Sequence, residues 1–241
     1  MDFTYEQMAK MIDHSLLNPN LAASDLEKGI GIARLYDVAS VCIMPYYLRR
    51  CAGLLAGSGV KASTTIGFPN GGHTTAAKVF EAHQAVRDGG EELDVVVNIS
   101  KVLSGDWDYV RDDIGAVLET AHAAGALVKV IFENALLQDE HKIRLCEICG
   151  ELRADWVKTS TGYASGGATD ADLILMRKHS PPHVQVKAAG GVRTLDRLLE
   201  VRALCVTRAG ATQTVAMLND CRQRLGLPPI EAEAPATVSG Y

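Results

Sequence analysis

Two lysines, Lys158 and Lys187, each end a short apolar segment and are followed at once by small residues. An amine at the carboxyl end of a buried strand has little water around it, so its charged form is disfavoured, and a second amine nearby lowers its pKa further. A lysine that is partly neutral near neutral pH is a nucleophile. For either lysine alone, the alternative is an ammonium group that reaches solvent from the strand end. The repeated pattern favours one site with two amines.

Glycines follow both lysines and provide a place for an anion. Because glycine has no side chain, it lets backbone N–H groups come close to a bound phosphate. A third loop, expected between the last strand and its helix, adds glycine and hydroxyl groups at a helix start. Simple helix capping by Thr212 is the alternative there. The residues predicted to bind substrate around this anion site are Thr159, Gly162, Gly190, Gly191, Gly210 and Thr212.

The elements that must position these residues form a repeat of strand and helix. Apolar runs rich in Val, Ile and Leu recur along the chain, and each is followed by a loop and a segment with helical periodicity. Eight such units predict a single-domain (β/α)8 barrel of the TIM type. An open doubly wound sheet is the rival fold, but the even repeat without a Gly-rich dinucleotide fingerprint favours the barrel. The predicted strands span 11–14, 40–43, 62–66, 93–98, 127–132, 155–158, 184–187 and 204–207.

The chain shows no internal linker, so one barrel domain is expected over 1–225. Residues 226–241 are rich in proline and are predicted to form an irregular tail. Short polar residues before apolar periodic segments mark helix starts. The residues predicted to cap helices in this way are Ser24, Asp25, Asp106 and Thr194.

Barrel enzymes place their chemistry at the carboxyl ends of the strands, and this rule selects polar residues on the first two strands. Asp13 and Ser15 share one side of the first strand, and Cys42 lies on the second. We predict that all three bind substrate. The alternatives are a capping role for Asp13 and, for Cys42, a small side chain that fills the core.

Two charged residues lie within the predicted fourth and fifth strands. Asp94 is expected to face the barrel interior, where a carboxylate needs a cationic partner or a proton. Lys158 and Lys187 are its natural partners, and a purely structural ion pair is the alternative. Lys129 lies in the middle of the fifth strand and could join the same network. Its spacing does not decide its role, and we include it among the residues predicted to bind substrate.

Composition excludes several classes of partner. The net charge of -5 gives no general attraction to nucleic acid or anionic membranes, so any phosphate must be held by a local site. No apolar run is long enough to span a bilayer, and the first ten residues do not read as a secretory signal, so a cytoplasmic protein is expected. The lone CxxC at 146–149 and the scattered histidines give no metal site, and no cofactor is expected.

The chain contains, among others, the segments IDHSLL at 12–17, IGFP at 66–69, LDVVVN at 93–98, VKTSTG at 157–162 and VKAAGGVR at 186–193. These segments resemble the signature blocks of the deoxyribose-phosphate aldolase family, a group of class I aldolases. The resemblance implies a reversible aldol reaction that joins acetaldehyde to D-glyceraldehyde 3-phosphate without a metal. It implies that Lys158 forms a Schiff base, that Lys187 tunes it, and that Asp94 relays protons.

The resemblance also bears on assembly and on the chain end. Barrels of this family are often dimers or tetramers, so a homo-oligomer acting on small aldehydes and sugar phosphates is expected. Tyr241 is similar to the terminal tyrosine of some members, whose tail enters the site to assist proton transfer. A disordered end is the alternative.

Two departures from the family pattern weaken the expected phosphate site. After Gly210 the chain has Ala211, Thr212 and Gln213 where the family usually has two small hydroxyl residues, and Tyr163 stands where some members carry a lysine. A Schiff-base aldolase for an unphosphorylated or different aldehyde is therefore an alternative. A non-catalytic barrel that binds sugar phosphate is the second alternative.

Overall fold

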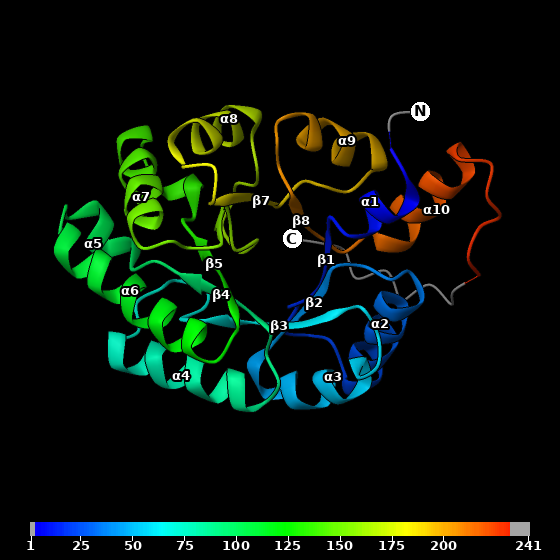
Figure 1. The fold of residues 1–241 in the computed structure, drawn as a ribbon, viewed down its shortest axis with the longest axis horizontal. Helices are drawn as coiled ribbons and strands as arrows, with labels where there is room; N and C mark the ends of the chain where they lie inside the picture. Colours follow the sequence, from blue (N-terminus) through cyan, green and yellow to red (C-terminus); the bar gives the residue numbers. More distant parts are fainter. Residues whose placement is uncertain (1–2, 232–241) are drawn as a thin grey trace.

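A closed barrel of eight parallel strands forms the centre of the protein, in the order β1 to β8 around the ring (Figure 1). The computed structural model describes residues 3–231. β1 pairs with both β2 and β8, which closes the ring. The predicted single-domain (β/α)8 fold is confirmed. The strands are β1 (Ile12–Leu16), β2 (Ser40–Ile43), β3 (Lys61–Ile66), β4 (Glu92–Val96), β5 (Leu127–Ile131), β6 (Trp156–Lys158), β7 (Gln185–Ala189) and β8 (Arg208–Ala211).

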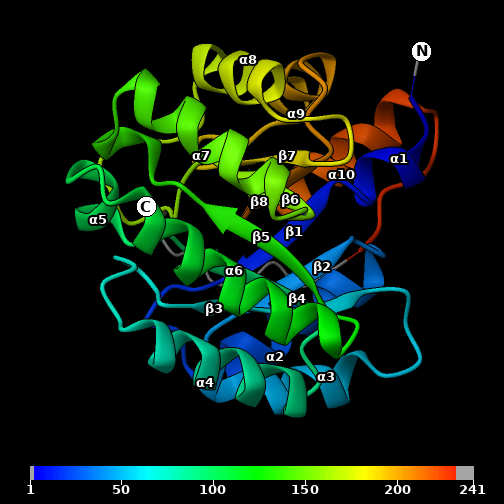
Figure 2. The ribbon, with the colours of Figure 1, turned by 60° about the vertical axis from the view of Figure 1, so that its left-hand side comes forward.

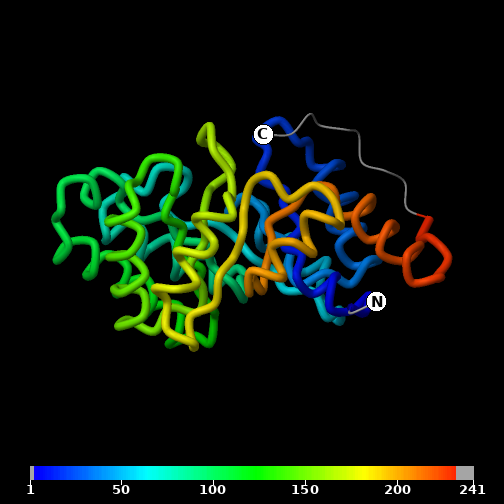
Figure 3. Tube along the Cα trace, turned by 90° about the horizontal axis from the view of Figure 1, so that it is seen from above, coloured from blue at the N-terminus to red at the C-terminus, as the bar shows by residue number. Residues whose placement is uncertain are grey.

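Helices surround the strands on the outside, as Figures 1 and 2 show from two directions. Helix α1 packs against α10, so the first and last helices are neighbours, blue and orange-red in Figure 3. The helices are α1 (Tyr5–Ala9), α2 (Ala23–Leu35), α3 (Leu48–Leu55), α4 (Thr75–Arg87), α5 (Ile99–Leu103), α6 (Trp107–Ala123), α7 (Asp139–Glu151), α8 (Asp170–His179), α9 (Leu195–Ala203) and α10 (Thr214–Arg224), with the short 3-10 turns η1 (Pro45–Tyr47) and η2 (Asn134–Leu136). In the part of the chain that the structure describes, none of these helices is long and apolar enough to cross a membrane.

The strands present two different faces because their side chains alternate. On β5, Val128 and Val130 belong to the apolar core between the sheet and the helices. Lys129 lies between them and points into the barrel, where it is fully buried among carboxylates. Barrel interiors are usually filled with branched apolar side chains. Here charged side chains occupy much of the interior.

The last strand begins later than predicted. The apolar residues at 204–207 were expected to form the strand, but Leu204 ends α9 and Cys205 has a left-handed backbone with φ 63°. The Val206 N–H donates back to the carbonyl of Val201, so these residues form the turn out of the helix. β8 therefore starts at Arg208, which places the Arg208 side chain inside the barrel.

The capping predictions are confirmed at two helices and wrong at a third. The side chains of Asp106 and Thr194 cap α6 and α9, because each accepts a hydrogen bond from a backbone N–H group in the first turn of its helix. At α2 the cap is Ala22 rather than Ser24 or Asp25. The Asp25 carboxylate instead accepts a bond from the Ala22 N–H, from a position inside the helix.

Candidate active site

One carboxylate joins three lysines inside the barrel. Asp94 on β4 accepts hydrogen bonds through Oδ2 from Lys158 Nζ at 2.7 Å and from Lys187 Nζ at 2.7 Å. Its other oxygen, Oδ1, accepts from Lys129 Nζ at 3.0 Å. All four side chains are buried. Because Lys158 and Lys187 contact the same oxygen atom, their amines lie side by side, and neither reaches bulk solvent.

The pKa of Lys158 is lowered from its ordinary value. Burial is the main cause because it disfavours the ammonium form. The charge of Lys187 lowers the pKa further, while Asp94 acts in the opposite direction and raises it. Loss of water and the second amine, the two causes expected from the sequence, both lower the pKa of Lys158, and loss of water is the larger effect.

The neighbouring groups keep their charges. Burial acts to lower the pKa of Lys187, but Asp13 and Asp94 outweigh it, and the pKa is raised. Burial also acts to raise the pKa of Asp94, yet the surrounding lysines hold it well below its ordinary value. Asp94 is therefore an anion between cations, and Lys158 is the amine of this group that most readily becomes neutral.

Lys129 lies deeper in the barrel than the two lysines at the mouth. Its amine contacts Glu92 at 2.6 Å and Asp13 at 3.4 Å in addition to Asp94. These carboxylates raise its pKa well above the ordinary value, although burial alone would lower it. Lys129 was predicted to bind substrate, but it does not line the pocket described below.

A pocket opens at the carboxyl ends of the strands, above Lys158 and Lys187. Of the predicted substrate-binding residues, Lys129 and Thr159 lie outside it. The Thr159 hydroxyl instead bridges β6 to β7 through the backbone of Ala189, at 3.1 Å to its oxygen and 3.0 Å from its nitrogen. The pocket is lined by Asp13, Ser15, Leu17, Cys42, Lys158, Thr161, Gly162, Tyr163, Lys187, Ala189, Gly190, Gly191, Val192, Arg193, Gly210, Ala211 and Thr212.

The glycine loops meet backbone to backbone at one wall of this pocket. Gly190 has φ +80°, and a Cβ atom built on it would lie 2.8 Å from the Cα of Gly167 in the preceding loop. The Ala168 N–H donates to the carbonyl oxygens of Ala189 and Gly190, both at 3.1 Å. Only glycine allows this approach without strain. The loops after β6 and β7 are therefore held together as one wall.

The start of α10 closes the far side of the pocket. The helix is capped by Gln213, whose side chain makes no hydrogen bond to the first turn, so the alternative reading of Thr212 as the helix cap does not hold. Thr212 is exposed and lines the pocket. Unpaired N–H groups at a helix start favour an anion nearby. The wall of glycines and this helix start together suit a phosphate group.

Tyr163, which departs from the family pattern, also lines the pocket. Its hydroxyl donates to the backbone carbonyl of Leu17 at 2.6 Å, and its ring packs edge-on against Phe68 with centroids 5.0 Å apart. The loop after β6 is thus tied to the loop after β1. Tyr163 shapes the pocket wall but brings no positive charge to an anion.

Sequence reasoning missed a buried clamp behind the same loop. Glu133, at the end of β5, has φ 61° and is buried. Its carboxylate accepts hydrogen bonds from the backbone N–H and the hydroxyl of Thr161. A left-handed backbone at a non-glycine residue is not visible in a sequence pattern. Arg193, which also lines the pocket, belonged to a quoted block but was given no role.

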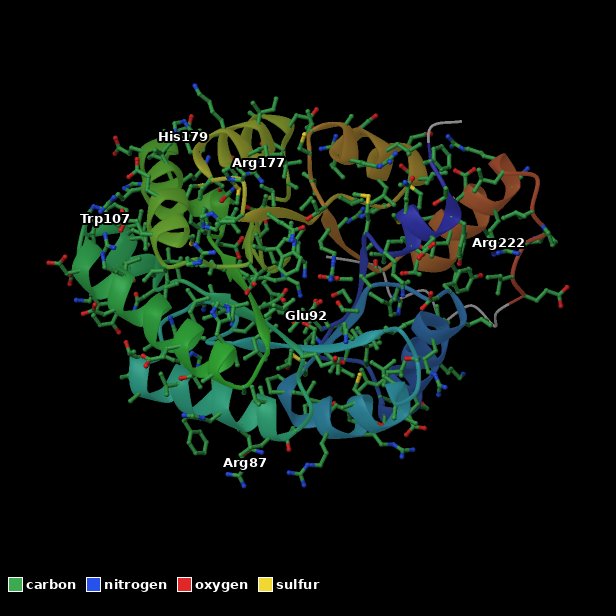
Figure 4. The ribbon with its side chains drawn as sticks, viewed as in Figure 1. Arg87, Glu92, Trp107, Arg177, His179 and Arg222 are labelled. Atoms are coloured by element: carbon green, nitrogen blue, oxygen red, sulfur yellow. The ribbon has the colours of Figure 1, made fainter. Side chains whose placement is uncertain are left out.

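Two more missed residues lie under the lysines. Arg208 and Glu92 are the first residues of β8 and β4, away from the pocket. Arg208 pairs with Glu92 and also with Asp13, which does line the pocket. Figure 4 labels Glu92 in the middle of the ring of strands. Glu92 could have been found, because it shares the side of Asp94 by the period of two. Arg208 could not, because its strand was placed too early.

Within the described residues, no group of three or more His, Cys, Asp or Glu side chains could hold a metal ion. Cys146 and Cys149 are buried inside α7, where burial raises the pKa of both thiols. Tyr241 lies outside the described residues, as does most of the predicted tail.

The arrangement can carry out amine chemistry on a carbonyl group. A buried amine that is easily made neutral can add to an aldehyde, and the protonated imine that follows withdraws electrons from the neighbouring carbon. A carboxylate and a second amine stand beside it to accept and return protons. The pocket above is lined by residues of β1, β2, β6, β7 and β8 and of the loops after β1, β6, β7 and β8, and most of its lining lies on the side of β6 to β8.

Comparison with known proteins gives the family. Residues 7–223 match the sequence profile described as DeoC/LacD family aldolase. The chain is 66% identical over 240 residues to a deoxyribose-phosphate aldolase of Rhodopirellula baltica, covering 100% of this chain and 99% of the relative. It is 44% identical over 214 residues to the deoxyribose-phosphate aldolase of Lysinibacillus sphaericus, covering 89% and 96%.

Solved structures agree with this result. The deoxyribose phosphate aldolase of Aeropyrum pernix, described as a unique tetrameric structure, superimposes with a TM-score of 0.84 at 29% identity, covering 92% of this chain and 93% of that one. A structure described as QR15, an aldolase, gives a TM-score of 0.86 at 32% identity, covering 90% and 97%. The chain belongs to the DeoC/LacD family of aldolases.

Proposed function

We propose that this protein cleaves 2-deoxy-D-ribose 5-phosphate reversibly to D-glyceraldehyde 3-phosphate and acetaldehyde, as a class I aldolase. The observation that carries the proposal is the pair of buried amines, Lys158 and Lys187, that share one oxygen of Asp94 beneath the pocket. The similarity of the whole chain to curated deoxyribose-phosphate aldolases supports the substrate.

In the proposed mechanism, the neutral amine of Lys158 adds to the aldehyde carbon C1 of the open-chain sugar. Loss of water gives a protonated imine. A base then removes the proton of the 3-hydroxyl group, the bond between C2 and C3 breaks, and its electron pair forms an enamine with the imine carbon. D-Glyceraldehyde 3-phosphate leaves, the enamine is protonated at C2, and water releases acetaldehyde and the free lysine.

Asp94 and Lys187 supply the proton transfers in this proposal. Lys187 stays charged and keeps Lys158 from taking up a proton, and Asp94 moves protons together with Lys187 and a water molecule. Asp13, Ser15 and Cys42 line the pocket beside the amines, where they would contact the sugar. Gly190, Gly191, Gly210 and Thr212, with Gly162, would bind the phosphate through N–H groups and one hydroxyl.

The Schiff base is tested by borohydride reduction in the presence of acetaldehyde, followed by mass mapping of the peptides. A stable adduct is expected on Lys158 in the parent and is expected to be absent in Lys158→Met. Lys178→Met, which removes an exposed lysine on α8, serves as the matched control and should react as the parent does. A Lys158→Met protein that still forms an adduct and turns over would end the proposal.

The substrate is tested separately by comparing cleavage of 2-deoxyribose 5-phosphate with cleavage of 2-deoxyribose. The proposal expects a strong preference for the phosphorylated sugar. Equal activity on both would favour an aldolase for unphosphorylated aldehydes, which Tyr163 and Ala211 in the pocket wall would then explain.

We also propose a homo-oligomer, a dimer or tetramer, that works in the cytoplasm on small aldehydes and sugar phosphates. The tetrameric relative from Aeropyrum pernix supports the assembly. Light scattering at defined concentrations measures it directly, and a monomer at micromolar concentration would refute it.

A further inference from the structure

Seven charged side chains form one connected ion-pair network inside the barrel. Four are cations and three are carboxylates, so one positive charge is left over when all seven are ionised. Such an excess is costly in a buried site, and the loss of one proton would remove it. The members are Asp13, Glu92, Asp94, Lys129, Lys158, Lys187 and Arg208.

The cations are not equally well compensated. Lys129 contacts Asp13, Glu92 and Asp94 together. Lys187 lies 2.6 Å from Asp13 and 2.7 Å from Asp94. Among the carboxylates that the structure describes, Lys158 forms an ion pair with Asp94 only, and it shares that oxygen with Lys187. The excess charge is therefore removed at the lowest cost by deprotonation of Lys158.

Arg208 is the cation that creates this excess without approaching the pocket. Its two terminal nitrogens contact the two oxygens of Glu92, at 2.7 and 3.1 Å. The same group reaches Asp13, and its guanidinium lies 5.1 Å from the ring of Trp156. A guanidinium keeps its proton in proteins, so its charge is permanent. Neither Arg208 nor Glu92 lines the pocket.

We propose that Arg208 and Glu92 are positioning residues that fix the charge balance of the barrel interior and so determine whether Lys158 is neutral. The inference rests on the proposed Schiff-base role of Lys158. Arg208 acts through Asp13, which also contacts Lys187, and Glu92 acts through Lys129, which also contacts Asp94. Neither residue touches the substrate.

The groups that face Lys158 come from five strands. Asp94 on β4 and Lys187 on β7 are its direct neighbours, with Cys42 on β2, Asp13 on β1 and Lys129 on β5 around them. The pKa of the Cys42 thiol is raised by burial, so Cys42 stays neutral and does not compensate the excess charge. The remaining groups are held in their charged forms by their ion pairs.

The proposal predicts opposite effects for the two partners of one ion pair. Glu92→Gln removes a negative charge, so neutral Lys158 is favoured more strongly and its pKa falls. Arg208→Met removes the excess positive charge, so protonated Lys158 is tolerated and its pKa rises. A purely structural ion pair would instead make the two variants alike, because each change breaks the same contact.

The test is the pH dependence of kcat/KM for retro-aldol cleavage. The rising limb of this profile reports the pKa of the essential base in the free enzyme. We expect the limb to move to lower pH in Glu92→Gln and to higher pH in Arg208→Met. Each shift should be about one pH unit, because one unit charge that acts on Lys158 through the protein interior without direct contact changes its pKa by about that much. Below the limb, Arg208→Met should then be about tenfold slower than the parent at equal pH.

Three controls complete the experiment. The double variant Glu92→Gln with Arg208→Met should return the limb towards that of the parent, and Arg208→Lys, which keeps the charge, should leave it near the parent. Arg49→Met, which breaks an exposed pair with Asp88, should not move it. If Arg208→Met does not fold, the downward shift in Glu92→Gln and the unmoved limb in Arg208→Lys remain as the required results.

Borohydride mapping of the adduct separates the two proposals. If the adduct forms on Lys158 in every variant but the limb stays in place or moves in the same direction in both single variants, the role of Arg208 and Glu92 is wrong. If the adduct does not form on Lys158 in the parent, the Schiff-base proposal fails first, and this inference fails with it.

Discussion

The contact between Gly190 and Gly167 should make Gly190→Ala far more damaging than its neighbour Gly191→Ala. Both glycines have a left-handed backbone, with φ +80° and +87°. An alanine in that conformation costs about 1–2 kcal/mol at either position. At Gly191 nothing lies within 4 Å of the added Cβ, whereas at Gly190 the added atom meets the Cα of Gly167 at 2.8 Å.

The loops around Gly190 must separate to admit the methyl group. The shared hydrogen bond from Ala168 to the backbone of Ala189 and Gly190 would then be weakened, and such bonds contribute about 1 kcal/mol each. We therefore expect a loss in the free energy of unfolding of about 2–4 kcal/mol for Gly190→Ala and about 1–2 kcal/mol for Gly191→Ala.

Urea unfolding of both variants measures the difference in the free energy of unfolding. The ratio of kcat/KM for 2-deoxyribose 5-phosphate to kcat/KM for 2-deoxyribose measures the preference for the phosphorylated sugar, to which the glycine wall is proposed to contribute. The ratio should fall in Gly190→Ala by more than in Gly191→Ala, since only the former displaces the loop after β6. Gly72→Ala, at an ordinary φ with open space around it, is the control. Equal losses in the two variants would show that the close approach of the loops does not hold the wall together.

Three further predictions test the site and its surroundings. Asp94→Asn should lower kcat by about 10²–10⁴-fold because the proposed proton carrier is lost, while borohydride still traps acetaldehyde on Lys158; an unchanged kcat would contradict the proposed relay. Glu133→Gln should raise KM for the phosphorylated sugar by about tenfold at similar kcat, because the charged acceptor that holds Thr161 is lost; equal effects on 2-deoxyribose would argue against a phosphate wall. His14 is buried and bonds to Thr214, and burial lowers its pKa to about 4 from 6.5. As the pH falls, the unfolded chain therefore binds the extra proton before the folded chain does. The free energy of unfolding should fall between about pH 6.5 and 4, by up to about 3 kcal/mol. His14→Gln should flatten this slope in urea titrations, and a slope that persists in His14→Gln would assign it to other groups.

The sequence was sufficient for the parts of the site that follow strand periodicity. Lys158, Lys187 and Asp94 were placed together because the ends of parallel strands meet at one edge, and the structure puts their charged atoms in contact. The inward direction of Glu92 follows from the same period of two, because Glu92 precedes Asp94 by two residues on β4.

Other parts could not be read from the pattern. The start of β8 depends on the left-handed backbone of Cys205, which its residue type does not predict. Because the strand was predicted to start four residues too early, the inward direction of the Arg208 side chain was not recognised. The clamp from Glu133 to Thr161 joins two loops through tertiary packing. Thr159 was predicted from its neighbours to bind substrate, but its hydroxyl is used between two strands.

The ionic interior also constrains how the barrel can fold. Asp13 near the start of the chain is neutralised by Lys187 and Arg208 near its end, so a half-barrel would bury carboxylates and ammonium groups without their counterions. Partial structures of this chain should therefore remain wet at their centre until the last strand docks. Ring closure and the expulsion of water from the interior would then be a single event, and a fragment lacking β8 should not form a dry core.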